Sequence, residues 1–136
     1  MHEASIALSI LSKLEEITSS AKNVKRVTRV KISVGMLSMV DIEALKFALE
    51  VLSKGTIAEG MRIDIEIAKP RFKCSRCQHT WVMEDIPNSL TELKTILHLN
   101  PEVIVNYLQC PKCGSRDVEI IEGSSIILQS VEVETA

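Results

Sequence analysis

Two C-x₂-C pairs constrain this 136-residue chain more than any other feature of its sequence. Cys74 and Cys77 form the first pair, and Cys110 and Cys113 form the second. Each two-residue gap lets both thiolates of a pair reach one side of the same metal ion, so two pairs close a tetrahedral site of four sulfurs. Soft thiolates select zinc or iron over hard cations, and four of them leave no open coordination position. The spacing therefore predicts a structural metal site, most simply Zn(2+).

Two other interpretations of the cysteines are less favourable. Disulfides suit exported proteins, but the chain shows no apolar run of about 20 residues for a membrane span and no cationic stretch after Met1 for a signal peptide. We therefore expect a cytoplasmic protein without a membrane segment. A redox dithiol needs only one C-x-x-C pair, placed at the start of a helix. This sequence instead has two C-x₂-C pairs, each of which we call a knuckle because its turn would wrap one side of a metal ion.

The spacer between the cysteine pairs is long. Thirty-two residues separate Cys77 from Cys110, against about 15–20 in compact zinc ribbons. We expect residues 85–106 to form a hairpin or helix of their own, with Leu90, Leu93 and Leu97 as an apolar stripe.

A zinc-ribbon nucleic-acid or transcription accessory protein is the main alternative from another functional class. Four cations lie near the knuckles and could suggest nucleic acid: Arg71, Lys73, Arg76 and Lys112. However, the net charge is −2 and aromatic residues make up only 3% of the chain. Both values disfavour a nucleic-acid surface, and we interpret the four cations as part of an ordinary solvated face.

Apolar periodicity predicts an α+β fold for the rest of the chain. Helical spacing covers Ala4–Ala21 and Ile42–Lys54, and Asp41 is a good N-cap for the second helix. Alternating apolar residues predict strands at 27–35, 61–68, 118–121 and 126–133. We expect two helices on a three-stranded mixed sheet in a domain made of residues 1–69 plus 116–136, with an inserted zinc-ribbon-like domain at 70–115.

The amino terminus offers a second, different set of metal ligands. With histidine in second position, the Met1 α-amine, the His2 amide nitrogen and the His2 imidazole can surround one cation. Such a planar nitrogen set suits Ni(II) or Cu(II), and Glu3 can add an oxygen or hold the imidazole by a hydrogen bond. Most chains with a histidine at this position simply have a disordered end, so the residues alone make metal binding the minority interpretation.

The combined features resemble the HypA/HybF family of hydrogenase-maturation nickel chaperones. The resemblance covers essentially the whole chain and includes Met1-His2-Glu3, Val34-Gly35-Met36-Leu37, Phe47-Ala48, the Gly60 turn and the four cysteines. It implies that Met1, His2 and Glu3 hold nickel transiently, while the cysteines hold structural zinc. The long spacer looks like the archaeal version of the family.

The same resemblance implies partners: the GTPase HypB, and the large subunit of a [NiFe] hydrogenase as the recipient of the nickel. It leaves a homodimer open. No nucleotide-binding loop or nucleophile–histidine–carboxylate set is apparent, so we expect a protein that is not an enzyme.

Two histidines of the knuckle region carry separate expectations. His98 lies between leucines in the spacer, where a histidine is usually a core or partner-facing residue, but a hinged module could bring it to the nickel as an extra ligand. His79 follows Cys77 by two residues, and we expect it to form a hydrogen bond near the zinc.

Overall fold

The computed structural model describes residues 2–136, apart from the side chains of His2 and Thr91. The chain divides into two compact units, one containing Val40–Glu66, Ile127–Ala136 and the amino-terminal part up to Ile32, the other Ser33–Met39 and Ile67–Ile126. The predicted α+β class is confirmed. No helix among the described residues is long and apolar enough to cross a membrane.

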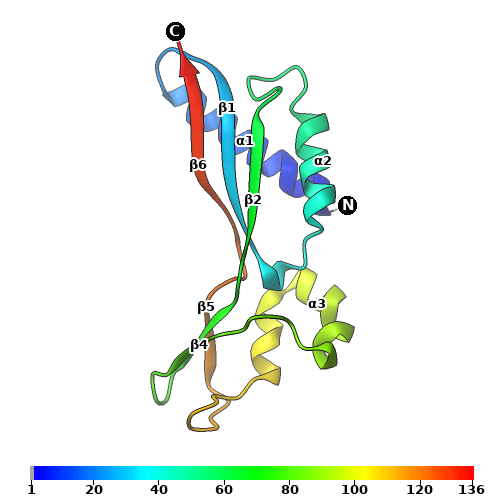
Figure 1. Ribbon diagram of the computed structural model, residues 1–136, viewed down its shortest axis with the longest axis vertical. Coiled ribbons are helices and arrows are strands. Elements are labelled where there is room, and N and C mark those ends of the chain that lie inside the picture. Colours follow the sequence, from blue (N-terminus) through cyan, green and yellow to red (C-terminus); the bar gives the residue numbers. More distant parts are fainter. Residues whose placement is uncertain (1) are drawn as a thin grey trace. The chain divides into compact units, whose positions relative to one another are not determined.

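The first unit is a three-stranded mixed sheet with two helices (Figure 1). Its elements are α1 (His2–Ser20), β1 (Val24–Gly35, which continues into the second unit), α2 (Ile42–Leu52), β2 (Arg62–Ala68) and β6 (Ile126–Thr135). The strand order is β2-β1-β6, and α1 crosses one face of this sheet. The predicted N-cap is confirmed, because an Asp41 carboxylate oxygen accepts a 3.1 Å bond from the Ala44 N–H.

The core of this unit follows from the apolar periodicity. Leu14 of α1 and Leu45 and Leu49 of α2 are almost or completely buried. The two helices contact each other, and Val27, Val30 and Ile32 of β1 are also fully buried. This packing explains why α1 and α2 form where their stripes predict.

Solvent-exposed side chains of neighbouring strands form several ion pairs. Arg29 of the central strand lies 2.5 Å from Asp64 and 3.2 Å from Glu132, and Arg26 lies 2.6 Å from Glu134. The Arg29 hydrogen bond lowers the pKa of the Asp64 carboxyl below its ordinary value. Exposed pairs of this kind contribute little stability each.

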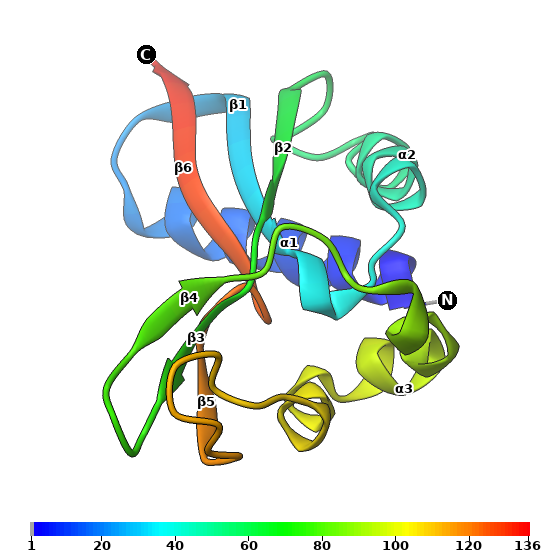
Figure 2. The same ribbon diagram turned by 60° about the horizontal axis from the view of Figure 1, so that its bottom comes forward.

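The second unit is a small antiparallel sheet with a helical segment beside it (Figure 2). Its strand order is β4-β3-β5. The elements are η1 (Met36–Ser38), β3 (Arg71–Cys74), β4 (Thr80–Val82), η2 (Asn88–Leu93), α3 (Lys94–Leu99), η3 (Pro101–Tyr107) and β5 (Val118–Glu122).

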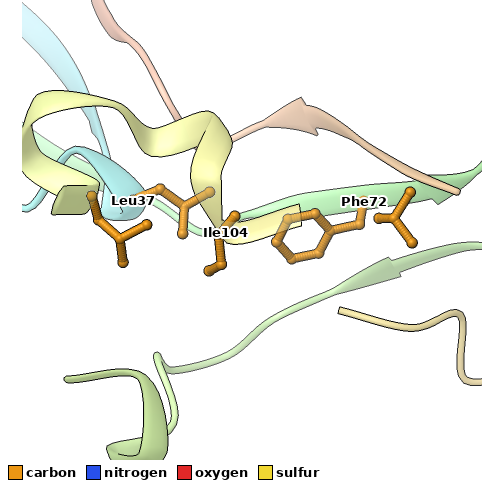
Figure 3. Close-up of a cluster of buried hydrophobic side chains, with 5 residues drawn as sticks. Leu37, Phe72 and Ile104 are labelled. Atoms are coloured by element: carbon orange, nitrogen blue, oxygen red, sulfur yellow. The ribbon is translucent and has the colours of Figure 1, made fainter. Parts of the chain in front are cut away.

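A second hydrophobic cluster unites these elements. Its buried members are Leu37, Phe72, Leu97, Ile104 and Val118, three of which are labelled in Figure 3. Leu90 and Leu93 pack against it, so the predicted apolar stripe of the spacer is confirmed in helical form. The long spacer is therefore an integral part of this core.

The strand at residues 118–122 differs from the expectation. The predicted first domain includes this strand in its segment 116–136, but β5 pairs with β3, with Cys74 opposite Val118. The reason is that Val118 and Ile120 complete the cluster around Phe72. The predicted domain ranges, as independently folding pieces, stay a prediction.

Candidate metal centre

The two C-x₂-C segments adopt the same local backbone structure. The N–H of Cys74 donates to the carbonyl of His79, and that of Cys110 donates to Ser115, both at 2.8 Å. Returning bonds of 2.9 Å run from the fourth residue after each of these cysteines, Gln78 and Gly114, to the first carbonyl. The two segments therefore share one hydrogen-bond pattern, which follows from their common sequence spacing.

The residue after each pair has a left-handed backbone. Gly114 has φ of 75°, which glycine adopts without strain. Gln78 takes φ of 67° at the equivalent position of the first knuckle. Sequence reasoning missed this equivalence, because no glycine marks the first turn.

The four cysteine sulfurs form a compact cluster. All four lie within 4.8 Å of one another, and two cross-knuckle pairs, Cys74–Cys113 and Cys77–Cys110, are each 3.6 Å apart. A regular tetrahedron with zinc–sulfur bonds of 2.3 Å has edges of about 3.8 Å. The cysteines are free thiols, so the donor set fits a four-coordinate zinc ion and not a pair of disulfides.

Backbone N–H groups surround the sulfurs. Cys77 N–H points to the Cys74 sulfur at 3.5 Å, and the Lys112 and Cys113 N–H groups point to the Cys110 sulfur at 3.4 and 3.5 Å. The Cys77 N–H is the main reason why the pKa of Cys74 falls to about 7. These donors stabilise thiolates, the form that binds metal.

Cys110 and Cys113 show the competing influences of the same environment. Burial alone would raise the pKa of Cys110, but the N–H groups of Cys113 and Lys112 bring it below its ordinary value. At Cys113 the Ser115 N–H lowers the pKa, whereas desolvation and the three neighbouring sulfurs raise it to about 11. The crowding of sulfurs thus raises the pKa of Cys113 alone among the thiols of Cys74, Cys110 and Cys113, and metal binding requires the thiolate form.

His79 contributes to the knuckle through its backbone and its ring face. Its carbonyl accepts the Cys74 N–H bond, and its ring stacks on Trp81 with centroids 5.8 Å apart. The expected hydrogen bond near the metal is thus made by the backbone carbonyl.

One of the cations near the knuckles forms an ion pair: Arg71 lies 3.0 Å from Glu122.

The predicted nickel ligands are described only in part. Met1 and the His2 side chain lie outside the described residues. Glu3, in the first turn of α1, accepts a 3.2 Å hydrogen bond from the N–H of Asp41, the N-cap of α2. Among the described residues, the cysteines are the only group of three or more metal-binding side chains gathered together.

His98 is oriented by the backbone of another segment. Its Nδ1 lies 2.9 Å from the carbonyl oxygen of Ser38, at the end of η1. Sequence reasoning found His98 but missed this bond and the Glu3–Asp41 bond. Both bonds join residues far apart in the chain. In each bond one partner is a backbone group, and the residue type at that position does not reveal such a contact.

The whole chain also matches a known family. The model of the family described as "Hydrogenase/urease nickel incorporation, metallochaperone, hypA" aligns with residues 1–133. The chain belongs to the HypA family. As a HypA family member it is a nickel metallochaperone and not an enzyme, as the sequence resemblance implies.

Curated relatives agree with this assignment, and a solved structure shares the fold. Hydrogenase maturation factor HypA of Ignicoccus hospitalis is 39% identical over 136 residues, covering 98% of this chain and 97% of the relative. HypA of Pyrococcus furiosus is 36% identical, covering 98% and 96%. The solution structure of the Ni metallochaperone HypA from Helicobacter pylori has a TM-score of 0.64 and 24% identity, with 98% of each chain covered, which shows the shared fold.

Proposed function

We propose that this HypA chain captures Ni(II) at its amino terminus and delivers it to the large subunit of a [NiFe] hydrogenase, with the HypB GTPase as partner in the transfer. The observation that carries the proposal is the family match itself, because it begins at residue 1 and includes Met1-His2-Glu3. The relatives from Ignicoccus hospitalis and Pyrococcus furiosus are described as hydrogenase maturation factors.

The four cysteines hold a structural zinc ion in this proposal. Their sulfur spacing and their backbone N–H donors support a closed S₄ site. Such a site retains its metal, because no coordination position is open to an incoming ligand. Reduced thiols are typical of the cytoplasm, where we place the protein.

The proposed nickel ligands, unlike the four cysteines, are suited to releasing their metal. A terminal amine, a backbone nitrogen and one imidazole form a planar set that Ni(II) accepts, and few protein groups must be replaced when the metal is handed over. In this proposal Glu3 adds a carboxylate oxygen to the set or holds the imidazole by a hydrogen bond. One Glu3 carboxylate oxygen accepts a hydrogen bond from the Asp41 N–H, which ties this residue to the first turn of α2.

His98 completes the proposed nickel ligands. An imidazole is a ligand that Ni(II) accepts, and the Nδ1 of His98 lies 2.9 Å from the Ser38 carbonyl oxygen. We therefore include His98 as an additional nickel ligand beside Met1, His2 and Glu3.

Replacing His2 tests the proposed function. In a calorimetric titration of untagged protein with Ni(II), we expect His2→Ala to weaken binding at least 100-fold, beyond the roughly 10–100-fold cost of losing an outer-sphere partner. Zinc content should stay at one per chain, and Ser5→Ala, an exposed change in the same helix turn, should bind nickel normally. Unchanged nickel affinity in His2→Ala would refute the proposed capture site.

A further inference from the structure

The bond between His98 and Ser38 has a defined direction. A carbonyl oxygen has no proton to donate, so the His98 Nδ1, at 2.9 Å, must carry the hydrogen. In a neutral imidazole only one nitrogen is protonated, and the other has the lone pair. The bond therefore selects the tautomer in which Nε2 is the metal-binding nitrogen.

The acceptor carbonyl is held rigidly by its own turn. The buried Ser38 hydroxyl donates to the carbonyl of Gly35 at 2.6 Å. Gly35 N–H bonds to Ser125 at 2.8 Å, and Leu37 N–H bonds to Gly123 at 3.0 Å. A Cβ on Gly35 would lie 2.4 Å from the backbone of Gly123, so the turn fits closely against this segment.

The histidine is held by the same core. Leu97, the residue before His98, is fully buried in the cluster that contains Leu37, the residue before Ser38. The two partners of the hydrogen bond are thus each preceded by a side chain anchored in one hydrophobic cluster. Such an arrangement fixes both the position and the orientation of the imidazole.

We propose that the Gly35–Ser38 turn is a positioning element that presets His98 to bind nickel through Nε2, with Ser38 as the positioning residue. This inference rests on the proposed function, because it concerns the same cargo. Metal-binding histidines commonly donate their second N–H to a backbone carbonyl, which fixes the tautomer and raises the basicity of the ligand nitrogen. Here the turn supplies that carbonyl before the metal arrives.

The tautomer can be measured without nickel. In ¹⁵N-labelled, zinc-loaded, nickel-free protein in mildly alkaline buffer, we expect the NMR signals of His98 to show a protonated Nδ1 and an unprotonated Nε2. Added Ni(II) should then perturb Nε2. A predominant Nε2–H tautomer would overturn the inference, and it would leave the His2 test of the proposed function unaffected.

Two serine variants separate positioning from general stability. Ser38→Ala and Ser53→Ala each remove a buried hydroxyl that donates to the carbonyl three residues earlier. We expect Ser38→Ala to lower the Nδ1–H population of His98 and to weaken nickel binding roughly tenfold, the lower end of the cost of losing an outer-sphere partner. Ser53→Ala should change neither. Equal effects of the two variants on nickel would contradict a positioning role.

A change at His98 itself keeps the bond to Ser38 but removes the ligand. In His98→Asn, the side-chain amide can still donate to the Ser38 carbonyl, but it has no nitrogen lone pair for a metal. We expect folding and zinc content to be retained and nickel binding to weaken roughly tenfold. Unchanged nickel affinity would overturn the inference, whereas a loss in His2→Ala would still support capture at the amino terminus.

Discussion

Cys110→Ser is expected to release zinc and to unfold the region 70–115. Cys110 supplies one sulfur, receives two backbone N–H groups and begins the second knuckle. Structural zinc contributes about 10–16 kcal/mol in small zinc-finger peptides, so the loss should exceed that of any single apolar contact. Zinc content by elemental analysis and the amide NMR spectrum together measure the effect.

A matched control separates the effect of losing a metal-binding sulfur from the effect of any side-chain change in a knuckle. Ser75→Ala changes an exposed side chain between the first two cysteines, and its N–H bond to Asp117 is made by the backbone and persists. We expect this variant to retain zinc and the wild-type spectrum. If Cys110→Ser lost its zinc but kept the wild-type amide spectrum, the site would not be structural.

An uncleaved tag fused before Met1 is expected to abolish specific nickel binding while leaving zinc in place. The extension converts the α-amine into an amide and so removes one of the three nitrogens in the proposed planar set. Calorimetric titration with Ni(II) measures the loss. The same tag placed after Ala136 is the control and should have no effect, and normal nickel affinity in the amino-terminally extended protein would remove the amine from the ligand set.

Local signals in the sequence predict much of this fold. Asp41 caps α2 because its carboxylate is next to the free N–H groups of the first turn, a contact made within four residues. The strand near 62–68 and the cysteine knuckles are equally local, because alternation and two-residue spacing act over a few positions. For such features, residue type and spacing are sufficient.

Contacts between distant residues account for what the sequence does not predict. β5 has the alternation of a strand, but its partner β3 is decided by packing around Phe72. The bonds of Glu3 to Asp41 and of His98 to Ser38 use backbone groups as partners. Every residue has a backbone carbonyl, and every residue except proline has a backbone N–H. These contacts therefore depend on the folded chain and not on a sequence motif.

X-ray absorption on one sample of untagged protein, loaded with one equivalent of Ni(II), compares the two proposed metal environments directly. We expect the zinc edge to show four sulfur neighbours at about 2.3 Å. The nickel edge should show nitrogen and oxygen neighbours only, with features of a planar site. Sulfur neighbours around nickel, or nitrogen neighbours around zinc, would contradict the assignment of a retained metal to the cysteines and of the delivered metal to the amino terminus.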